Sequence, residues 1–161
     1  MNFRHVQAPT AVVMVRPHRF RVNSETLADN AFQSLVDLTL SDDRIAAMAR
    51  DEFDGCVEAL TGAGVTVHVF DDFGQLDTPD SVFPNNWFST HHGGRIAIYP
   101  MFAPNRRRER RADVIELLKS TYRVQEVIDY SGLEYDNLFL EGTGAMVLAH
   151  LERVAYVANS F

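Results

Sequence analysis

The chain has 161 residues, of which 46% are hydrophobic, and a formal net charge of −7 from 22 acidic and 15 basic side chains. This length predicts one domain, and the acidic balance disfavours a general nucleic-acid binder, which needs a basic surface. The single cysteine, Cys56, excludes an internal disulfide framework. Because no apolar run is long enough for a membrane span or a signal peptide, we expect a soluble, cytoplasmic protein without a membrane partner.

The N-terminal part of the chain predicts a β-α-β unit. Residues 11–15 are an apolar, β-branched run typical of a buried strand. After a mixed stretch with a short helix expected around residues 27–36, Ser41-Asp42-Asp43 marks the start of a longer helix, and Gly62-Ala63-Gly64 ends it. Residues 65–70 then form the second strand.

The longer helix carries apolar residues at three- and four-residue spacing, which predicts one face turned to the core. These residues are Ile45, Met48, Ala49, Phe53, Cys56, Val57 and Leu60. We therefore expect Cys56 to be a buried structural thiol, since free cysteine commonly packs as a small hydrophobe.

Residues 87–99 predict a β-hairpin whose turn is His91-His92-Gly93-Gly94. A helix capped by Asn105 is expected to run to about Ser120, and a strand at residues 123–128 completes a β-β-α-β unit. The apolar positions expected to face the core from this helix are Val114, Ile115, Leu117 and Leu118. The basic cluster of residues 106–111 is expected to be the solvated first turns of the same helix.

The pattern restarts after Gly132. Residues 145–148 and 153–157 predict another hairpin, and Arg95-Ile96-Ala97 superposes on Arg153-Val154-Ala155. The same offset along the chain places Asn86 over Gly144. We infer an internal repeat, complete once and then begun again. The expected units span approximately residues 10–71, 80–130 and, incompletely, 138–161.

Two polar segments precede the two hairpins. Asn85 and Asn86 follow a proline and are either turn formers or ligand-binding amides, which offer both donors and an acceptor without charge. Glu141 is either a loop carboxylate that contacts water or nearby backbone, or a functional group, because its apolar neighbours favour pairing or a shifted pKa.

The sequence predicts no metal and no cofactor. His91 and His92 are adjacent in a turn and point in different directions, and no set of ligands with metal spacing accompanies them. Gly142-Thr143-Gly144 is too short for a phosphate-binding loop and lacks its lysine.

Residues 79–83, Pro-Asp-Ser-Val-Phe, resemble a segment of dimethylarginine dimethylaminohydrolases, in which two acidic residues follow. Leu140-Glu141-Gly142-Thr143-Gly144 is similar to an acidic-Gly-Gly segment of the same superfamily, the guanidine-modifying enzymes or penteins, which include arginine deiminase. The closer similarity is to the citrulline-utilization hydrolase branch, often labelled amidinotransferase-like. Its matching segments here are residues 14–17, 83–87, 99–101 and 140–144.

The resemblance implies an α/β fold, an α/β-propeller of β-β-α-β units around a pseudo-fivefold axis, with about two to three of the five units in this chain. It implies chemistry in which a cysteine attacks the central carbon of a guanidino or ureido group and a histidine moves the proton. Glu141 matches the carboxylate near the catalytic histidine. The substrate-binding positions are matched by Asp80, Asn85, Asn86 and Arg106, with Arg107 as the alternative to Arg106.

Two departures from the family pattern bear on function. Asn85 and Asn86 replace paired carboxylates, which favours a neutral ureido substrate such as citrulline over arginine. The nucleophilic cysteine and its histidine have no match, since neither Cys56 nor His150 lies in the required motif. We therefore expect the N-terminal part of a hydrolase, inactive alone, that self-associates or associates with the missing half. A non-catalytic binding or scaffold module and an amidinotransferase are the alternatives.

Overall fold

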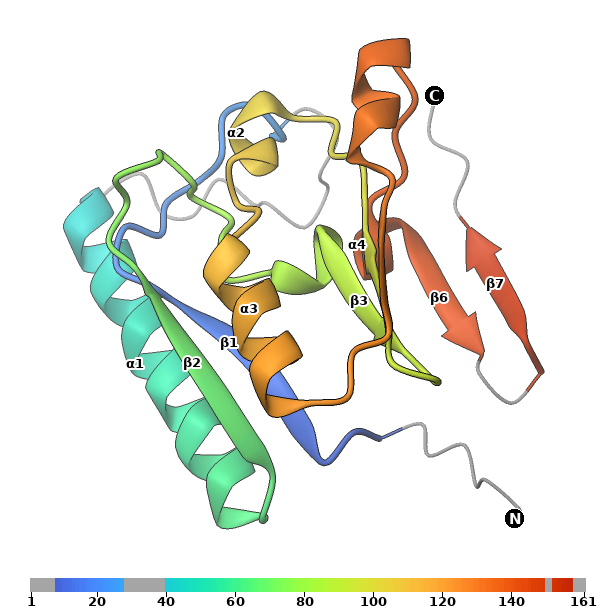
Figure 1. Cartoon of the computed structure of the whole chain (residues 1–161). Coiled ribbons are helices and arrows are strands. Elements are labelled where there is room, and N and C mark those ends of the chain that lie inside the picture. Colours follow the sequence, from blue (N-terminus) through green and yellow to red (C-terminus); the bar gives the residue numbers. More distant parts are fainter. Residues whose placement is uncertain (1–7, 28–39, 150–151, 158–161) are drawn as a thin grey trace. The chain divides into compact units, whose positions relative to one another are not determined.

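The computed structural model describes residues 8–27, 40–149 and 152–157 (Figure 1). The chain divides into two compact units. The βαβ unit comprises the described residues from 10 to 84 together with residues 103–110, and the hairpin unit comprises residues 8–9, 85–102 and the described residues from 111 onward. The helix expected around residues 27–36 lies almost wholly outside the described residues.

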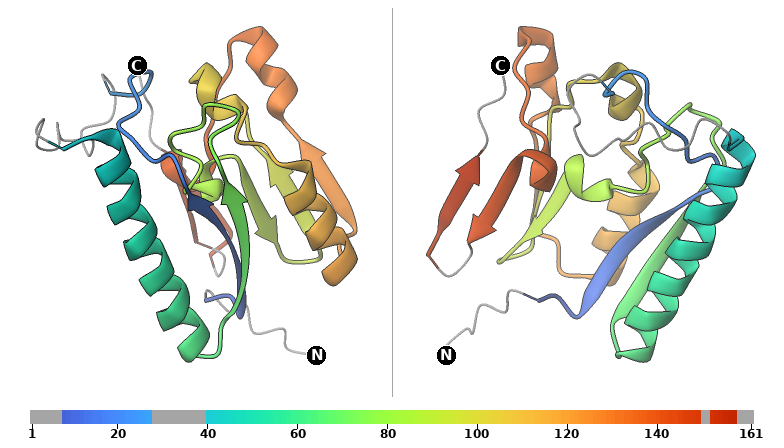
Figure 2. Two further views of the ribbon diagram at one scale, coloured as in Figure 1. Left: turned by 90° about the vertical axis from the view of Figure 1, so that its left-hand side faces the viewer. Right: turned by 180° about the vertical axis from the view of Figure 1, so that it is seen from behind.

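The βαβ unit confirms the predicted β-α-β order. Its elements are β1 (Ala11–Pro17), α1 (Asp42–Gly62) and β2 (Thr66–Asp72). β1 and β2 pair in parallel, with Ala11 opposite Thr66, and α1 runs beside them (Figure 2). The predicted signals set both ends of α1. Ser41 accepts a hydrogen bond from the Arg44 backbone N–H at the N-terminus, and Gly64 follows the C-terminus with a φ of +83°.

The apolar face of α1 is narrower than predicted. Ala46 and Phe53 are buried, but Met48 is 40% exposed and Cys56 is exposed, so the expectation of a buried Cys56 thiol is wrong. At about 100° per residue, Met48 lies roughly 200° around the helix from Ala46, and Cys56 lies about 60° from Phe53. The spacing alone therefore placed two residues wrongly in the core: Met48, which lies on the far face of the helix, and Cys56, which lies at the edge of the buried face.

The hairpin unit contains the predicted β-hairpin and its returning strand. β3 (Phe88–His91) pairs antiparallel with β4 (Arg95–Ile98), and β4 pairs in parallel with β5 (Glu126–Asp129). The turn between β3 and β4 places Gly93 and Gly94 at φ values of 83° and 74°, which glycine adopts without steric cost. The β-β-α-β unit is completed by a helix between β4 and β5.

The single helix expected over residues 105–120 is wrong. The structure has α2 (Pro104–Arg107) in the βαβ unit and α3 (Ala112–Thr121) in the hairpin unit, and the N-cap of α2 is Ala103 instead of Asn105. A continuous helix would place arginines of the cluster four residues apart on one face, where like charges repel. Of the predicted core positions, Val114, Ile115 and Leu118 are buried in α3.

The second predicted hairpin is present in the structure. β6 (Met146–Ala149) pairs antiparallel with β7 (Val154–Val157), and β6 begins and ends at the residues that the predicted offset assigns to β3. The short helix α4 (Gly142–Ala145) precedes β6 as the 3-10 helix η1 (Pro84–Asn86) precedes β3, and a second 3-10 helix, η2 (Ser131–Asp136), follows β5. Met146 packs with Ala97 and Tyr99. Within the described ranges, no helix is long and apolar enough to cross a membrane.

Candidate functional site

Asn85 and Asn86 lie in η1, immediately before β3, and their side chains form a fixed pair. Asn86 is buried, with 8% of its surface exposed, whereas Asn85 is exposed. Asn85 Nδ2 donates to Asn86 Oδ1 at 3.1 Å and to Thr143 Oγ1 at 2.8 Å, and Thr143 Oγ1 donates to the Asn85 carbonyl at 3.4 Å. The pair is therefore an oriented amide group, and not only a turn.

The segment around Thr143 approaches this pair so closely that only glycine fits on either side of it. A Cβ atom at Gly144 would lie 2.6 Å from Asn86 Oδ1, and one at Gly142 would overlap the Asn85 carbonyl and lie 3.0 Å from the Tyr99 ring. Both predicted polar segments thus meet within the hairpin unit. The glycines are required by this close packing, since neither has a positive φ.

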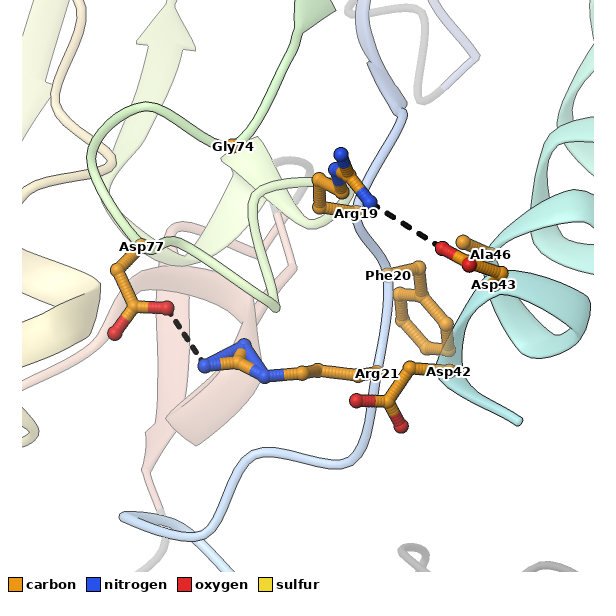
Figure 3. A pocket seen from close by; sticks show the side chains of 8 residues that line it. All are labelled: Arg19, Phe20, Arg21, Asp42, Asp43, Ala46, Gly74 and Asp77. Atoms are coloured by element: carbon orange, nitrogen blue, oxygen red, sulfur yellow. Dashed lines mark hydrogen bonds and ion pairs between the residues drawn. The ribbon is translucent and has the colours of Figure 1, made fainter. Parts of the chain in front are cut away.

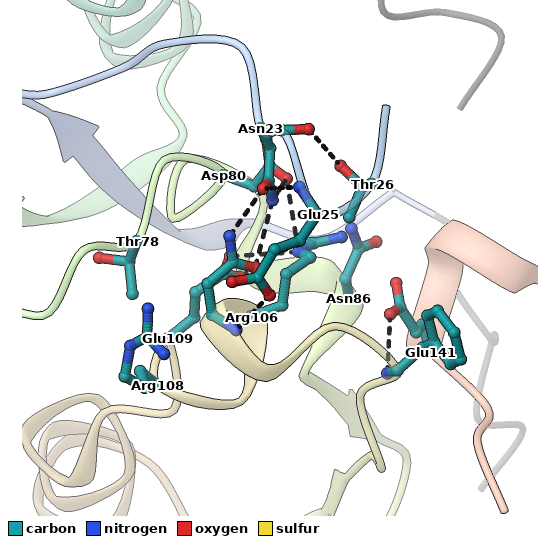
Figure 4. Close-up of polar contacts among 12 residues, drawn as sticks. Asn23, Glu25, Thr26, Thr78, Asp80, Asn86, Arg106, Arg108, Glu109 and Glu141 are labelled. Atoms are coloured by element: carbon teal, nitrogen blue, oxygen red, sulfur yellow. Dashed lines mark hydrogen bonds and ion pairs between the residues drawn. The ribbon is translucent and has the colours of Figure 1, made fainter. Parts of the chain in front are cut away.

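Glu141 precedes α4 and contacts backbone. Its Oε1 accepts a hydrogen bond from the Phe102 N–H at 3.2 Å (Figure 4), while the Glu134 carboxylate accepts from the Met101 N–H at 2.8 Å. The Leu140 N–H donates to the Pro100 carbonyl at 3.3 Å. Contact with nearby backbone, one of the alternatives left open by the sequence, is therefore observed for Glu141.

Asp80 and Arg106 come together in the βαβ unit, where both are buried. Arg106 Nε lies 3.8 Å from Asp80 Oδ2, and Arg106 forms a two-pronged ion pair with Glu109 through Nε at 3.1 Å and Nη2 at 3.2 Å (Figure 4). The expectation that the basic cluster is solvated is wrong for Arg106, which is buried. A buried guanidinium requires carboxylate partners, and Asp80 and Glu109 supply them. Arg107 is partly exposed.

Two buried asparagines complete this polar cluster; the sequence marked Asn105 only as a helix cap and did not single out Asn23. Asn23 Nδ2 donates to Asp80 Oδ2 at 2.6 Å, and Asn105 Nδ2 donates to Asn23 Oδ1 at 2.6 Å. Asn23 lies in the mixed stretch after β1, where no periodicity marks it. Glu109 could have been found, because it is the only acid in the basic cluster and stands three residues after Arg106, a spacing that brings side chains together on a helix.

Each predicted binding segment also has a buried polar atom beside it that lacks a partner. Ser81 Oγ, next to Asp80, and Trp87 Nε1, next to Asn86, make no hydrogen bond within the described part of the chain. Buried polar groups in folded proteins are nearly always hydrogen-bonded, so such atoms are typical of positions where water or a ligand binds.

His91 Nε2 lies 2.7 Å from Ser89 Oγ on β3, and His150 is outside the described residues. Among the described side chains, no group of three His, Cys, Asp or Glu residues could hold a metal ion.

The βαβ unit also contains an open pocket of about 300 Å³ that the sequence did not predict. Arg19 pairs with Asp43 at 3.3 Å and Arg21 with Asp77 at 2.6 Å across its lining (Figure 3). These pairs are exposed and neutralise most of the charge that the pocket presents.

Three comparisons place this geometry among known proteins. The profile of the family described as "N,N dimethylarginine dimethylhydrolase, eukaryotic" matches residues 16–161. No curated protein sequence matches the chain. Unliganded AgrE has a similar structure, with a TM-score of 0.61 and 17% identity over 94% of this chain and 20% of that chain.

Two further solved structures are similar. The complex of AgrE with ornithine and NAD+ has a TM-score of 0.59 and 19% identity, over 94% of this chain and 20% of that one. The N-terminal domain of an ArgZ variant, covalently bound to a reaction intermediate, has a TM-score of 0.58 and 15% identity, over 94% of this chain and 49% of that one. The chain thus spans about a fifth of AgrE and about half of the ArgZ domain, and these low identities bear on the fold alone. The family profile covers nearly all of the chain, which therefore belongs to the N,N-dimethylarginine dimethylhydrolase family of the guanidine-modifying, or pentein, superfamily.

Proposed function

We propose that this chain binds the side-chain head group of a ureido amino acid such as citrulline, as the substrate-binding part of a hydrolase that acts on C–N bonds. The observation that carries the proposal is the oriented amide pair of Asn85 and Asn86, which stands where the resemblance implies two carboxylates. The family acts on guanidino compounds by its description, so the difference at these two positions bears directly on the charge of the substrate.

The physical argument compares how well a carboxylate and an amide bind a substrate head group that has been largely desolvated. A guanidinium is a cation with only donors, and burying it without an opposite charge is costly. A ureido group is neutral and presents a C=O acceptor besides its N–H donors. The Asn86 carboxamide can meet both kinds of atom but cannot neutralise a cation, which favours the ureido group.

The remaining roles follow from the resemblance. Arg106 would bind the substrate carboxylate, with its guanidinium held by Glu109, and Asp80 would line the substrate site. Glu141 would act near a catalytic histidine. The cysteine nucleophile and that histidine would come from residues outside this chain, because Cys56, exposed on α1, does not lie in the family motif. The cysteine would attack the central carbon of the head group, ammonia or an amine would leave with a proton moved by that histidine, and water would hydrolyse the covalent adduct on the cysteine.

The fold supports a corresponding architectural proposal. The β-β-α-β repeat, in which β6 takes the place of β3 in the second copy, is what an α/β-propeller of repeated units requires. We propose that the chain supplies two to three of five such units, the N-terminal part of one catalytic domain. Its coverage of 49% of the ArgZ domain chain is in keeping with this proportion.

The proposal is tested by turnover in a full-length protein that contains this chain, with citrulline and arginine supplied separately and ammonia and ornithine measured. We expect a higher kcat/KM for citrulline. A preference for arginine would contradict the proposed substrate, and the absence of hydrolysis with retained binding of citrulline would favour the non-catalytic binding module.

A further inference from the structure

We propose that Thr143 is a positioning residue that, through Asn85, turns the NH2 group of Asn86 toward the ligand, so that this site recognises an acceptor oxygen. This inference rests on the proposed function, since it assigns the atom by which a ureido group would be recognised. Thr143 itself is exposed and acts on the recognising amide only through Asn85.

The hydrogen bonds within the hairpin unit fix the sense of the Asn86 amide. Thr143 Oγ1 donates its proton to the Asn85 carbonyl at 3.4 Å, so it accepts from the Asn85 side chain, and the Asn85 atom that it contacts is the donor Nδ2. Asn85 Nδ2 also donates to Asn86 at 3.1 Å, so the Asn86 atom in this contact is the acceptor, Oδ1. Thr143 Oγ1 receives the other N–H of Asn85 at 2.8 Å and thereby holds the Asn85 amide in the plane that reaches Asn86. Without this second contact, the exposed Asn85 amide would be held only by its hydrogen bond to Asn86.

With Oδ1 engaged, Asn86 Nδ2 is the group that remains for a ligand. Among the described residues, no hydrogen bond from Asn86 Nδ2 is found, even though Asn86 is buried, with only 8% of its surface exposed. A donor of this kind pairs with the oxygen of a ureido group. The same donor disfavours a guanidinium, because a guanidinium presents only N–H groups and the contact would place one donor against another.

Gly144 gives the amide the space to adopt this orientation. A side chain at this position would lie 2.6 Å from Asn86 Oδ1 and 3.3 Å from Nδ2, and would displace the amide from Asn85. Thr143 and Gly144 therefore act together: the hydroxyl orients the amide pair, and the missing side chain leaves room for it.

The test is calorimetric binding of citrulline, arginine and ornithine to the purified chain and to the variants Thr143→Val and Thr143→Ser. Valine keeps the shape of threonine and removes the hydroxyl, whereas serine keeps the hydroxyl and is the matched control. We expect Thr143→Val to weaken citrulline binding about five- to tenfold, the equivalent of one neutral hydrogen bond. We expect Thr143→Ser to bind as the parent chain does, and ornithine, which lacks the ureido group, to bind all three chains equally.

Equal citrulline affinity for the parent chain and Thr143→Val, or an equal loss of ornithine affinity, would overturn the inference. The side-chain amide NMR signals of Asn86 provide a readout that needs no ligand. We expect them to shift in Thr143→Val and not in Thr143→Ser, and unchanged signals in both would also overturn it. Failure of the parent chain to bind citrulline, with the Asn86 signals moved by Thr143→Val, would refute the proposed function and leave the positioning role of Thr143 intact.

Discussion

Asn85 and Thr143 occupy equivalent positions in two repeats and hydrogen-bond to each other at 2.8 Å. Asn86 and Gly144 are equivalent in the same way and are also in contact range. Equivalent atoms of repeats that are related by a rotation can meet only close to the rotation axis. In the propeller proposed above, this contact would mark the place where the repeats converge, and the pairing of an amide with a glycine there would break the symmetry in favour of one polar side chain.

We predict that Gly144→Ala destabilises the chain by about 1–3 kcal/mol, because the added methyl group overlaps the Asn86 amide and its neighbours must move. Gly132→Ala is the matched control in the same unit, since a Cβ there would have no atom within 4 Å. Chemical denaturation followed by circular dichroism measures both. Equal free energies of unfolding for the two variants would show that the space at Gly144 is not needed.

The buried ion pair of Arg106 gives a second prediction. Glu109→Gln should destabilise the chain by about 3–5 kcal/mol, because it removes the two-pronged carboxylate partner of a buried guanidinium. Glu116→Gln removes the partner of Lys119 at the same three-residue spacing, but Glu116 is 69% exposed, and we expect less than about 0.5 kcal/mol. A small effect of Glu109→Gln on the free energy of unfolding in urea would contradict the buried ion pair between Arg106 and Glu109.

Asp71 should make stability depend on pH in the acid range. The hydrogen bond with His18 at 2.8 Å, and then that from Arg16 at 3.2 Å, hold the pKa of the Asp71 carboxyl below its ordinary value. The stabilisation is therefore present above the unfolded pKa of about 3.9 and is lost as the pH falls through the lower folded pKa. Because the side chain is 38% exposed, the contribution should not exceed about 1 kcal/mol.

Thermal unfolding of Asp71→Asn and the parent chain between pH 7 and pH 2 tests this linkage. We expect the variant to be less stable at pH 7 and the two curves to converge at the acid end. Asp43→Asn is the control, since that carboxylate is 88% exposed and pairs with Arg19 at the surface. A difference between Asp71→Asn and the parent chain that stays constant down to pH 2 would contradict the assignment.

The second hairpin should drive self-association of the chain. Val147 is 66% exposed and its cross-strand partner Tyr156 63%, so both present apolar surface on one face of the sheet that β6 and β7 form among the described residues. We expect sedimentation velocity to detect oligomers that the double substitution Val147→Lys and Tyr156→Lys removes. A monomer at all concentrations in the parent chain would contradict the prediction.

Most of the fold could be predicted from the sequence because its signals are local. The Ser41 cap, the glycine after α1 and the offset between the hairpins each depend on neighbouring residues or on repetition, and the structure follows them. The failures are cases in which tertiary contacts decide. Cys56 lies at the edge of the apolar face of α1, and the spacing of apolar residues does not show how wide that face is. Arg106 is buried because Asp80 and Glu109 surround it. Asn23 is part of that cluster through contacts with Asp80 and Asn105, which are distant in the chain and which no local pattern encodes.

The measurement that tests the central claim most directly is the affinity of the purified chain for citrulline and for arginine, before and after Asn86→Asp. The neutral amide should bind citrulline more tightly than arginine, and the carboxylate, which supplies a charge and removes the donor, should reverse this order. An arginine preference in the unmodified chain, or an order unaffected by Asn86→Asp, would contradict recognition of a neutral ureido group by Asn86.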